Sequence, residues 1–192
     1  MLNYGVRMRP SYRPAAVALV LAAALSASGC TPDASGKPPA STPSATALFA
    51  SDEEALAAAE EAYRAYVTTT DQIFAESGEG IERLEAVAVD DQLAEDRTGF
   101  EEIFKSGFRS TGQTTFDSIE LQQWSGDGHR ETEVVVYLCQ DISAVDVLDS
   151  TGKSVVLATR PDRIRYEVRL ASNAESPKLR VSNRSPWKET TC

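Results

Sequence analysis

The chain has 192 residues, of which 42% are hydrophobic and 7% aromatic, and its formal net charge at pH 7 is −10. This length suits one folded domain with flanking sequence. Nucleic-acid phosphates and anionic lipid headgroups repel a chain this acidic, so its charge argues against electrostatic binding of either.

The first 29 residues have the features of an export signal. Arg7, Arg9 and Arg13 precede an apolar run at 15–25, and small residues follow that run. A basic start, a short apolar core and a small-residue exit are typical of a segment that is removed during secretion. The run is too short for a membrane-spanning helix, which needs about 20 residues.

The export signal ends at Cys30, and this cysteine indicates a lipoprotein. The run Ala27, Ser28, Gly29, Cys30 resembles a bacterial lipobox, with Ala27 where leucine is usual. In such proteins the thiol receives a diacylglyceryl group, and two acyl chains give stable anchoring. We expect a lipoprotein signal peptide at 1–29 and a mature chain that begins at lipidated Cys30. The alternative is an ordinary secretory signal with a chance cysteine.

Residues 30–50 are predicted to be a disordered tether. The segment is rich in Pro, Ser, Thr and Ala, a composition that cannot bury enough apolar surface to offset its ordering entropy. As a flexible coil of about 20 residues, it would have a mean reach of roughly 25 Å. It would hold a folded domain, predicted at 51–192, on the extracytoplasmic face of the cell membrane.

The acidic residues concentrate at 52–61 and 71–102. We interpret them as solvated helix faces, and a cation site or a basic partner is the alternative. The acids lack the spacing of an EF-hand calcium loop. The chain also lacks a glycine-rich phosphate loop, a nucleophile elbow and a zinc-binding helix motif. We therefore expect no metal and no cofactor.

A long helix is expected to begin at Ser51. Ser51 and Glu54 match a capping box. Apolar residues then recur at three- and four-residue steps as far as Phe74, which is the pattern of one helix face. The glycines at 77–80 should end this helix.

Two further helices are expected before the first strand. One covers 81–88, with Ile81, Leu84 and Val87 on its apolar face. The next runs from about 91 to 107. It is expected to bury Leu93, Phe100, Ile103, Phe104 and Phe108.

After Gly112 the hydrophobic period changes to that of strands. The strand at 114–124 is expected to place Ile119 and Leu121 on one face, and Phe116 and Trp124 on the other.

Further strands are expected at 131–142, in a hairpin that turns at 149–152, at 163–170 and at 178–183. In the strand 163–170 the inward residues should be Ile164, Tyr166, Val168 and Leu170. Helices followed by hairpin-linked strands predict an α+β domain, with N-terminal helices packed on one face of an antiparallel sheet of about four to six strands.

Two cysteines remain if Cys30 is acylated. An even number of thiols in an oxidising compartment favours a disulfide between Cys139 and Cys192. A bridge that closes this loop would stabilise the fold by about 4 kcal/mol. A metal site is disfavoured because these cysteines and the single His129 lack ligand spacing. A nucleophilic Cys139 is also disfavoured, since it lies in a strand-like run.

The order of these elements, with the stretches "FKSGFRSTGQTTFDSIEL" and "VYLCQDIS…VDVLDSTGKSV…RYEVRL" and the closing "W…C", resembles the nuclear transport factor 2-like (cystatin-like) α+β cone. It looks like actinobacterial lipoproteins that carry this fold, and the resemblance covers about 51–192. It implies a curved sheet that wraps the long helix and leaves a pocket. Proteins with this fold include ketosteroid isomerases, polyketide-cyclase-like enzymes, dehydratases and non-catalytic binding domains. The fold alone therefore does not determine the function.

Isomerase-type enzymes of this fold need an acid–base carboxylate and an oxyanion donor that face one pocket. The catalytic candidates are Tyr63, Asp71 and Tyr166. The alternative is structural: the tyrosines fall on apolar faces, where their rings would pack with the hydroxyl at the rim. Asp71 would then be a residue of the polar helix face.

We expect a membrane-anchored lipoprotein that is not an enzyme and binds a protein or a small molecule. Trp124 and Trp187 are candidate aromatic anchors for a partner, although a core role is the alternative for each. An isomerase- or cyclase-like enzyme is the alternative function. A cell-wall spacer or assembly component, as a homodimer formed through the sheet, is a third possibility.

Overall fold

The computed structural model describes residues 48–126, 131–188 and 192. The predicted signal peptide, Cys30 and the tether up to residue 47 lie outside these residues, as does His129. Within the described ranges, no helix is both long enough and apolar enough to cross a membrane.

Helix α1 (Asp52–Ala75) begins at the predicted cap. The N–H of Glu54 donates to the hydroxyl of Ser51 at 3.3 Å, and the N–H of Ala50 donates to the carboxylate of Glu54 at 2.7 Å. The first bond satisfies one of the N–H groups that the opening turn of a helix leaves unpaired. The prediction of a long helix that ends before the glycines of 77–80 is confirmed.

The packed part of the chain includes two residues that the sequence assigned to the tether. Phe49 is buried, and its ring meets that of Trp124 edge-on at a centroid distance of 5.6 Å. Leu48 also packs against the core. The structured segment therefore starts before the predicted boundary at Ser51.

The helix predicted at 81–88 is present as the 3-10 helix η1 (Ile81–Ala86), which is two residues shorter. It ends early because the chain after it pairs with strand β6 (Arg180–Pro186). The N–H of Val181 donates to the carbonyl of Val87, and the N–H of Val89 donates to the carbonyl of Val181, both at 2.9 Å. These bonds replace the next turn of the helix.

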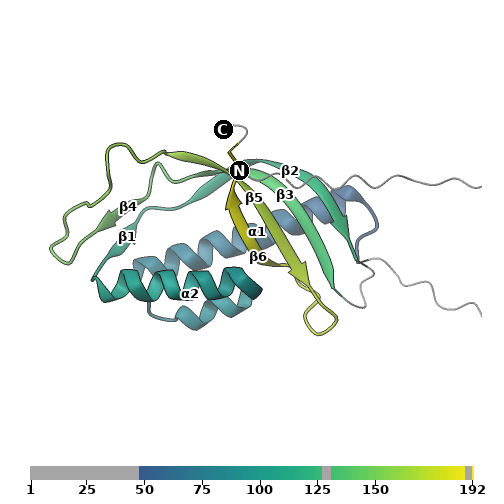
Figure 1. The fold of residues 1–192 in the computed structure, drawn as a ribbon, viewed down its shortest axis with the longest axis horizontal. Helices are drawn as coiled ribbons and strands as arrows, with labels where there is room; N and C mark the ends of the chain where they lie inside the picture. The colour runs from purple at the N-terminus through teal and green to yellow at the C-terminus, as the bar shows by residue number, and fades with distance from the viewer. Residues whose placement is uncertain (1–47, 127–130, 189–191) are drawn as a thin grey trace, which may run out of the picture. The chain divides into compact units, whose positions relative to one another are not determined.

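Helix α2 (Asp90–Lys105) lies close to its predicted position, but its burial differs from the prediction. Gln92 is its only buried residue. The apolar residues expected in the core are half-buried, and these are Leu93, Phe100, Ile103, Phe104 and Phe108. The reason is that α2 continues past the end of the main sheet (Figure 1), so its C-terminal half lies beyond the strands of that sheet.

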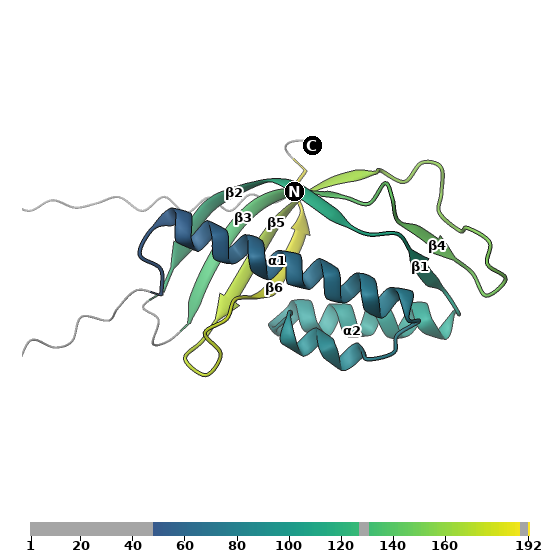
Figure 2. The same cartoon turned by 180° about the vertical axis from the view of Figure 1, so that it is seen from behind.

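The main sheet is antiparallel and has four strands in the order β2-β3-β5-β6. Its other members are β2 (Thr115–Ser125), β3 (Thr132–Asp141) and β5 (Arg163–Ser172). The strands curve, and α1 runs across their inner face (Figure 2). The prediction of an α+β domain with helices packed on an antiparallel sheet is confirmed.

Two short strands form a separate sheet beside the main one. Strand β1 (Arg109–Thr111) pairs with β4 (Asp146–Leu148), and the chain then turns at 149–152 as predicted. We call β1, β4 and the segment 149–160 the arm. Gly112, with φ of 85°, lies at its base, where a Cβ atom would overlap the carbonyl oxygen of Ala144.

The two predicted faces of β2 are wrong. Phe116, Ile119, Leu121 and Trp124 all pack against the same core. The pairing of β2 with β3 shifts register twice, first between Asp117 and Glu120 and again between Leu121 and Gln123. Each extra residue turns the following side chains to the opposite face, which period-two reasoning cannot anticipate.

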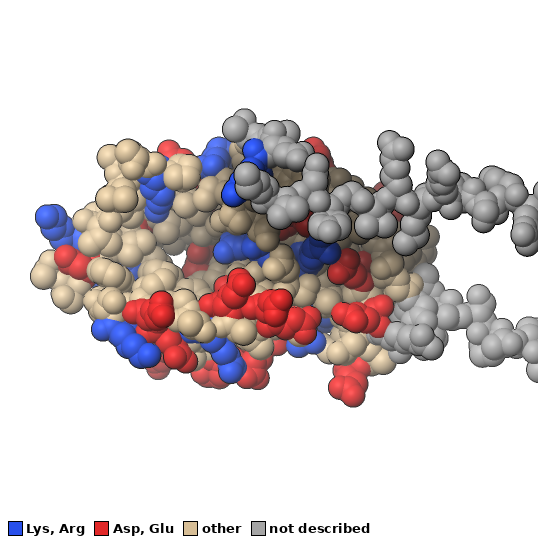
Figure 3. All heavy atoms as spheres, in the orientation of Figure 1, with Lys and Arg blue, Asp and Glu red and all other residues tan. Residues whose placement is uncertain are grey.

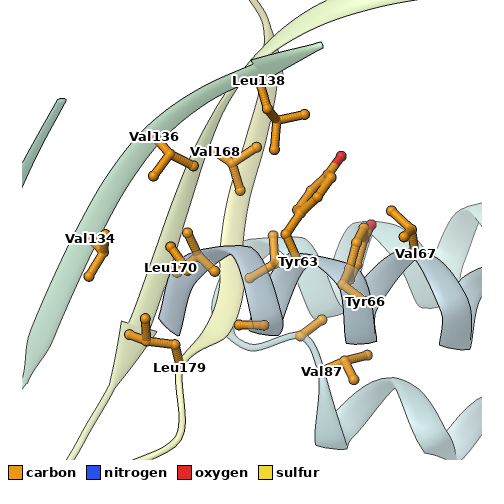
Figure 4. Packing of buried hydrophobic residues seen from close by; sticks show 14 of the residues in the cluster. Tyr63, Tyr66, Val67, Val87, Val134, Val136, Leu138, Val168, Leu170 and Leu179 are labelled. Atoms are coloured by element: carbon orange, nitrogen blue, oxygen red, sulfur yellow. The ribbon is translucent and has the colours of Figure 1, made fainter. Parts of the chain in front are cut away.

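The core lies between α1 and the inner face of the sheet (Figure 4). In β5 the predicted alternation is confirmed, since Val168 and Leu170 are fully buried. Tyr63 and Tyr66 project from α1 toward the strands, with their ring centroids 5.8 Å apart. Burying a side chain such as Leu170 contributes about 1.5–3 kcal/mol.

The structure places Cys139 and Cys192 at disulfide distance, with their Cα atoms 5.7 Å apart. This confirms the predicted pair. The segment that leads to the C-terminus is also held by Trp187, whose N–H donates to the carbonyl of Arg165 at 2.8 Å. The Trp187 ring packs on Tyr137 with centroids 4.7 Å apart. Trp187 therefore has a packing role here.

Candidate ligand-binding site

A pocket of about 250 Å³ lies between α1, α2, the arm and the inner face of β6. We call it the arm pocket. One part of its wall is apolar and is formed by Val67, Phe74, Phe100, Val145 and Val147. The other part is polar and includes Tyr66, Asp71, Asp96, Gln140 and Arg184.

A second hollow of about 440 Å³ shares Val67, Asp71 and Thr114 with the arm pocket, so the two meet at Asp71. The space-filling view shows an opening beside the arm (Figure 3). The charged lining of the second hollow consists of Asp71 and the exposed Arg64. The arm pocket is therefore the better candidate for a selective site.

Arg184 reaches the arm pocket from strand β6. It is paired with Val168 across the sheet, so both side chains lie on the inner face. Its guanidinium carbon lies 4.7 Å from the ring centroid of Tyr166 and 5.5 Å from that of Tyr66. Within the described residues, no carboxylate oxygen lies within 4.0 Å of this guanidinium. Arginine stays charged in proteins, so the pocket wall contains a cation that forms no direct salt bridge with the described residues, while the charge of Asp96 acts on it from further away.

Gln140 fixes the position of Arg184. The guanidinium donates to the side-chain oxygen of Gln140 at 2.8 Å, and the Tyr63 hydroxyl donates to the same oxygen at 2.7 Å. Burial raises the pKa of Tyr63 to about 12, so this phenol is a hydrogen-bond donor and not a base at neutral pH. Because Tyr63 is fully buried, it has no route to a ligand.

Asp96 on α2 is held by two neighbours. The Tyr66 hydroxyl donates to its carboxylate at 2.9 Å, and the side-chain amide of Gln92 donates at 2.8 Å. Burial raises the pKa of Asp96, and these two hydrogen bonds oppose that rise because they favour the anion. Burial also raises the pKa of Tyr66.

Asp71 joins α1 to the start of β2. Its two carboxylate oxygens accept hydrogen bonds from the backbone N–H and the hydroxyl of Thr114, both at 2.7 Å. Asp71 and Asp96 are half-buried, whereas most acids of the two helices are exposed. Asp and Glu side chains crowd the surface over the helices, with Lys and Arg among them (Figure 3).

Of the three catalytic candidates from the sequence, only Asp71 lines the arm pocket. Tyr63 is a core residue that positions Gln140. Tyr166 packs against Arg184. The structure therefore does not bring the three together as an acid–base set. Trp124 packs against Phe49 and donates to Asp52 at 2.8 Å, so it too has a structural role.

Sequence reasoning missed Arg184, Asp96 and Gln140. Gln140 continues the inward alternation of Val136 and Leu138, and this was an available signal. For Arg184 the alternation misleads, because a register shift between β5 and β6 turns it inward. Asp96 lay among many acids of a helix, and nothing in the sequence marks it as different.

The described residues contain no group of three His, Cys, Asp or Glu side chains that could hold a metal ion. Asp71 and Asp96 each have both oxygens engaged by protein donors. The expectation of no metal and no cofactor stays a prediction.

Fold and site together define an α+β domain with a small, charged pocket. No family model and no curated protein matches the chain. Among solved structures, it is similar to the crystal structure of the intermembrane space region of chloroplast protein ARC6. The TM-score is 0.51 at 15% sequence identity, and the match covers 70% of this chain and 97% of that one. At this identity the likeness concerns the fold alone.

Proposed function

We propose that the chain is a membrane-anchored extracytoplasmic lipoprotein whose folded domain binds a small polar molecule in the arm pocket and is not an enzyme. The guanidinium of Arg184 carries this proposal. Arg184 is half-buried, and a charge that is partly removed from water is stabilised by an oppositely charged partner. A ligand that places a hydrogen-bond acceptor against Arg184 would supply the missing partner.

The anchoring part of the proposal rests on the sequence. The lipobox-like run before Cys30 and the Pro- and Ser-rich segment after it suit a lipidated tether. The substitution Cys30→Ser should shift the protein from the membrane fraction to the soluble fraction and abolish labelling with a radioactive fatty acid. A variant that stays in the membrane fraction and matures normally would contradict the anchor.

The binding part can be tested before the ligand is known. The full-length chain is extracted in mild detergent and heated with and without a low-molecular-weight extract of the cells that produce it. A ligand that binds the folded state raises the midpoint of thermal unfolding. We expect a rise for the wild type and none for Arg184→Gln, while Arg163→Gln on the outer face of the sheet serves as the matched control.

The finer fold assignment is also a proposal. In a nuclear transport factor 2-like cone, a curved sheet wraps a long helix and leaves a pocket at one end. The position of the arm pocket beside the C-terminal half of α1 supports this assignment. Dimerisation through the sheet stays a prediction.

A proton-transfer enzyme is the second candidate, and the raised pKa of Asp96 favours it. A carboxyl group with a raised pKa beside a phenol is an arrangement that acid–base enzymes use. The two functions differ in what happens to the bound molecule. A binding protein returns it unchanged, whereas an enzyme converts many equivalents and Asp96→Asn stops the conversion.

A further inference from the structure

The charges around the arm pocket indicate a class of ligand, and this step rests on the proposed function. We propose that the ligand is an amino acid with a second ammonium group on its side chain. Its carboxylate would pair with Arg184, and its two ammonium groups would lie near Asp96 and Asp71.

The balance of charge favours such a molecule over a simple ion. Among the described residues that line the arm pocket, Arg184 is the only cation, and Asp71 and Asp96 are the two anions. A simple anion would pair with Arg184 but would meet two carboxylates. A simple cation would meet the guanidinium. One carboxylate and two ammonium groups complement all three side chains.

The positions of these groups suit one small ligand. Tyr66 separates the charges, because its ring lies 5.5 Å from the guanidinium carbon of Arg184 and its hydroxyl bonds Asp96 at 2.9 Å. Asp71 lies five residues further along α1, which is an axial rise of about 7.5 Å. The carboxylates of Asp96 on α2 and Asp71 on α1 therefore lie in different parts of the pocket wall.

The pocket lining also has an apolar part, which suits the methylene chain of such a ligand. Phe74 follows Asp71 by one turn of α1 and Phe100 follows Asp96 by one turn of α2, and their ring centroids are 5.7 Å apart. Val147 of the arm and Val145, which directly precedes the arm strand β4, line the same pocket. Such a surface accepts CH₂ groups, and the face of an aromatic ring also accepts an ammonium group.

The direct test is titration calorimetry on the full-length chain in mild detergent, with L-lysine as the probe. Three analogues each lack one charged group: L-norleucine, 6-aminohexanoate and 1,5-diaminopentane. We expect L-lysine to bind at least tenfold more tightly than each of them. The variant Asp71→Asn should lose the preference for L-lysine over L-norleucine, while Arg163→Gln should keep it.

Arg184→Lys retains the charge but loses the planar fork, so it should weaken binding of L-lysine more than binding of 1,5-diaminopentane. If this variant does not fold, the four probes on the wild type and on Asp71→Asn decide the matter. Equal affinity for all four probes, or none for L-lysine, overturns the inference. If the cell extract still protects the wild type in that case, the binding function stands and only the ligand class is wrong.

Discussion

Tyr66 and Asp96 join the two long helices at the edge of the arm pocket. The phenol on α1 donates to both oxygens of the carboxylate on α2, at 2.9 and 3.1 Å. The contact keeps an acidic group in a half-buried place where burial raises its pKa. It therefore couples the stability of the helix pair to pH.

The first prediction concerns the pH dependence that Asp96 creates. Its pKa is raised above the ordinary 3.8 in the folded protein, so the native state binds the proton more tightly than the unfolded chain does. As pH falls from 7 through the raised pKa toward 3.8, the wild type should gain stability relative to Asp96→Asn. Urea unfolding of both proteins across this range measures the difference. A constant difference would contradict the prediction.

The second prediction concerns Tyr63. Burial raises its pKa to about 12, whereas an unfolded tyrosine titrates near 10. The stability that this shift contributes is present below pH 10 and is lost as pH rises through about 12. In an alkaline titration followed by phenolate absorbance, Tyr63→Phe should remove one tyrosine from those that ionise late. If Tyr63→Phe instead lost a tyrosine that ionises near pH 10, the pKa of Tyr63 would not be raised and the prediction would be wrong.

The third prediction concerns the Cys139–Cys192 pair. The bridge ties the C-terminus to strand β3 across 53 residues of sequence. The substitution Cys192→Ser should lower the free energy of unfolding by about 4 kcal/mol. Alkylation of the native, unreduced protein should label neither cysteine, whereas reduction before alkylation should allow the exposed Cys192 to be labelled. Two thiols that react in the native, unreduced protein would rule the bridge out.

The fourth prediction concerns the base of the arm. Gly112 combines a positive φ with a close approach to Ala144, so Gly112→Ala would force the arm away from its present position. We expect a loss of stability of about 1–3 kcal/mol and weaker ligand binding. Gly152→Ala is the control, because it has a similar φ of 83° in the hairpin but meets no atom within 4 Å. Equal losses of binding in both variants would show that the arm's position does not matter.

The sequence predicted correctly those parts of the fold that depend only on neighbouring residues. The cap at Ser51, the breakers at 77–80 and the alternation of Val168 with Leu170 all act within a few residues, and each appears as predicted. The two cysteines could also be paired from their number alone. These features need no knowledge of the distant chain.

The features that the sequence did not predict depend on contacts between segments that are distant in the chain. The extra residues in β2 put Phe116 and Trp124 on the face expected for Ile119 and Leu121, and the register shift between Val181 and Asn183 turned Arg184 inward. The pairing of β6 with the chain after η1 shortened that helix. The pocket could not be derived from one segment, because its charged residues come from α1, α2 and β6.

The central claim is that the pocket beside Arg184 holds a small molecule in the native protein. Native mass spectrometry of the full-length chain, isolated from its own cells in mild detergent, tests it most directly. We predict that the wild type carries an extra low-molecular-weight mass that denaturation releases, and that Arg184→Gln carries none. Wild-type and variant proteins that differ only by the substituted side chain would contradict the account.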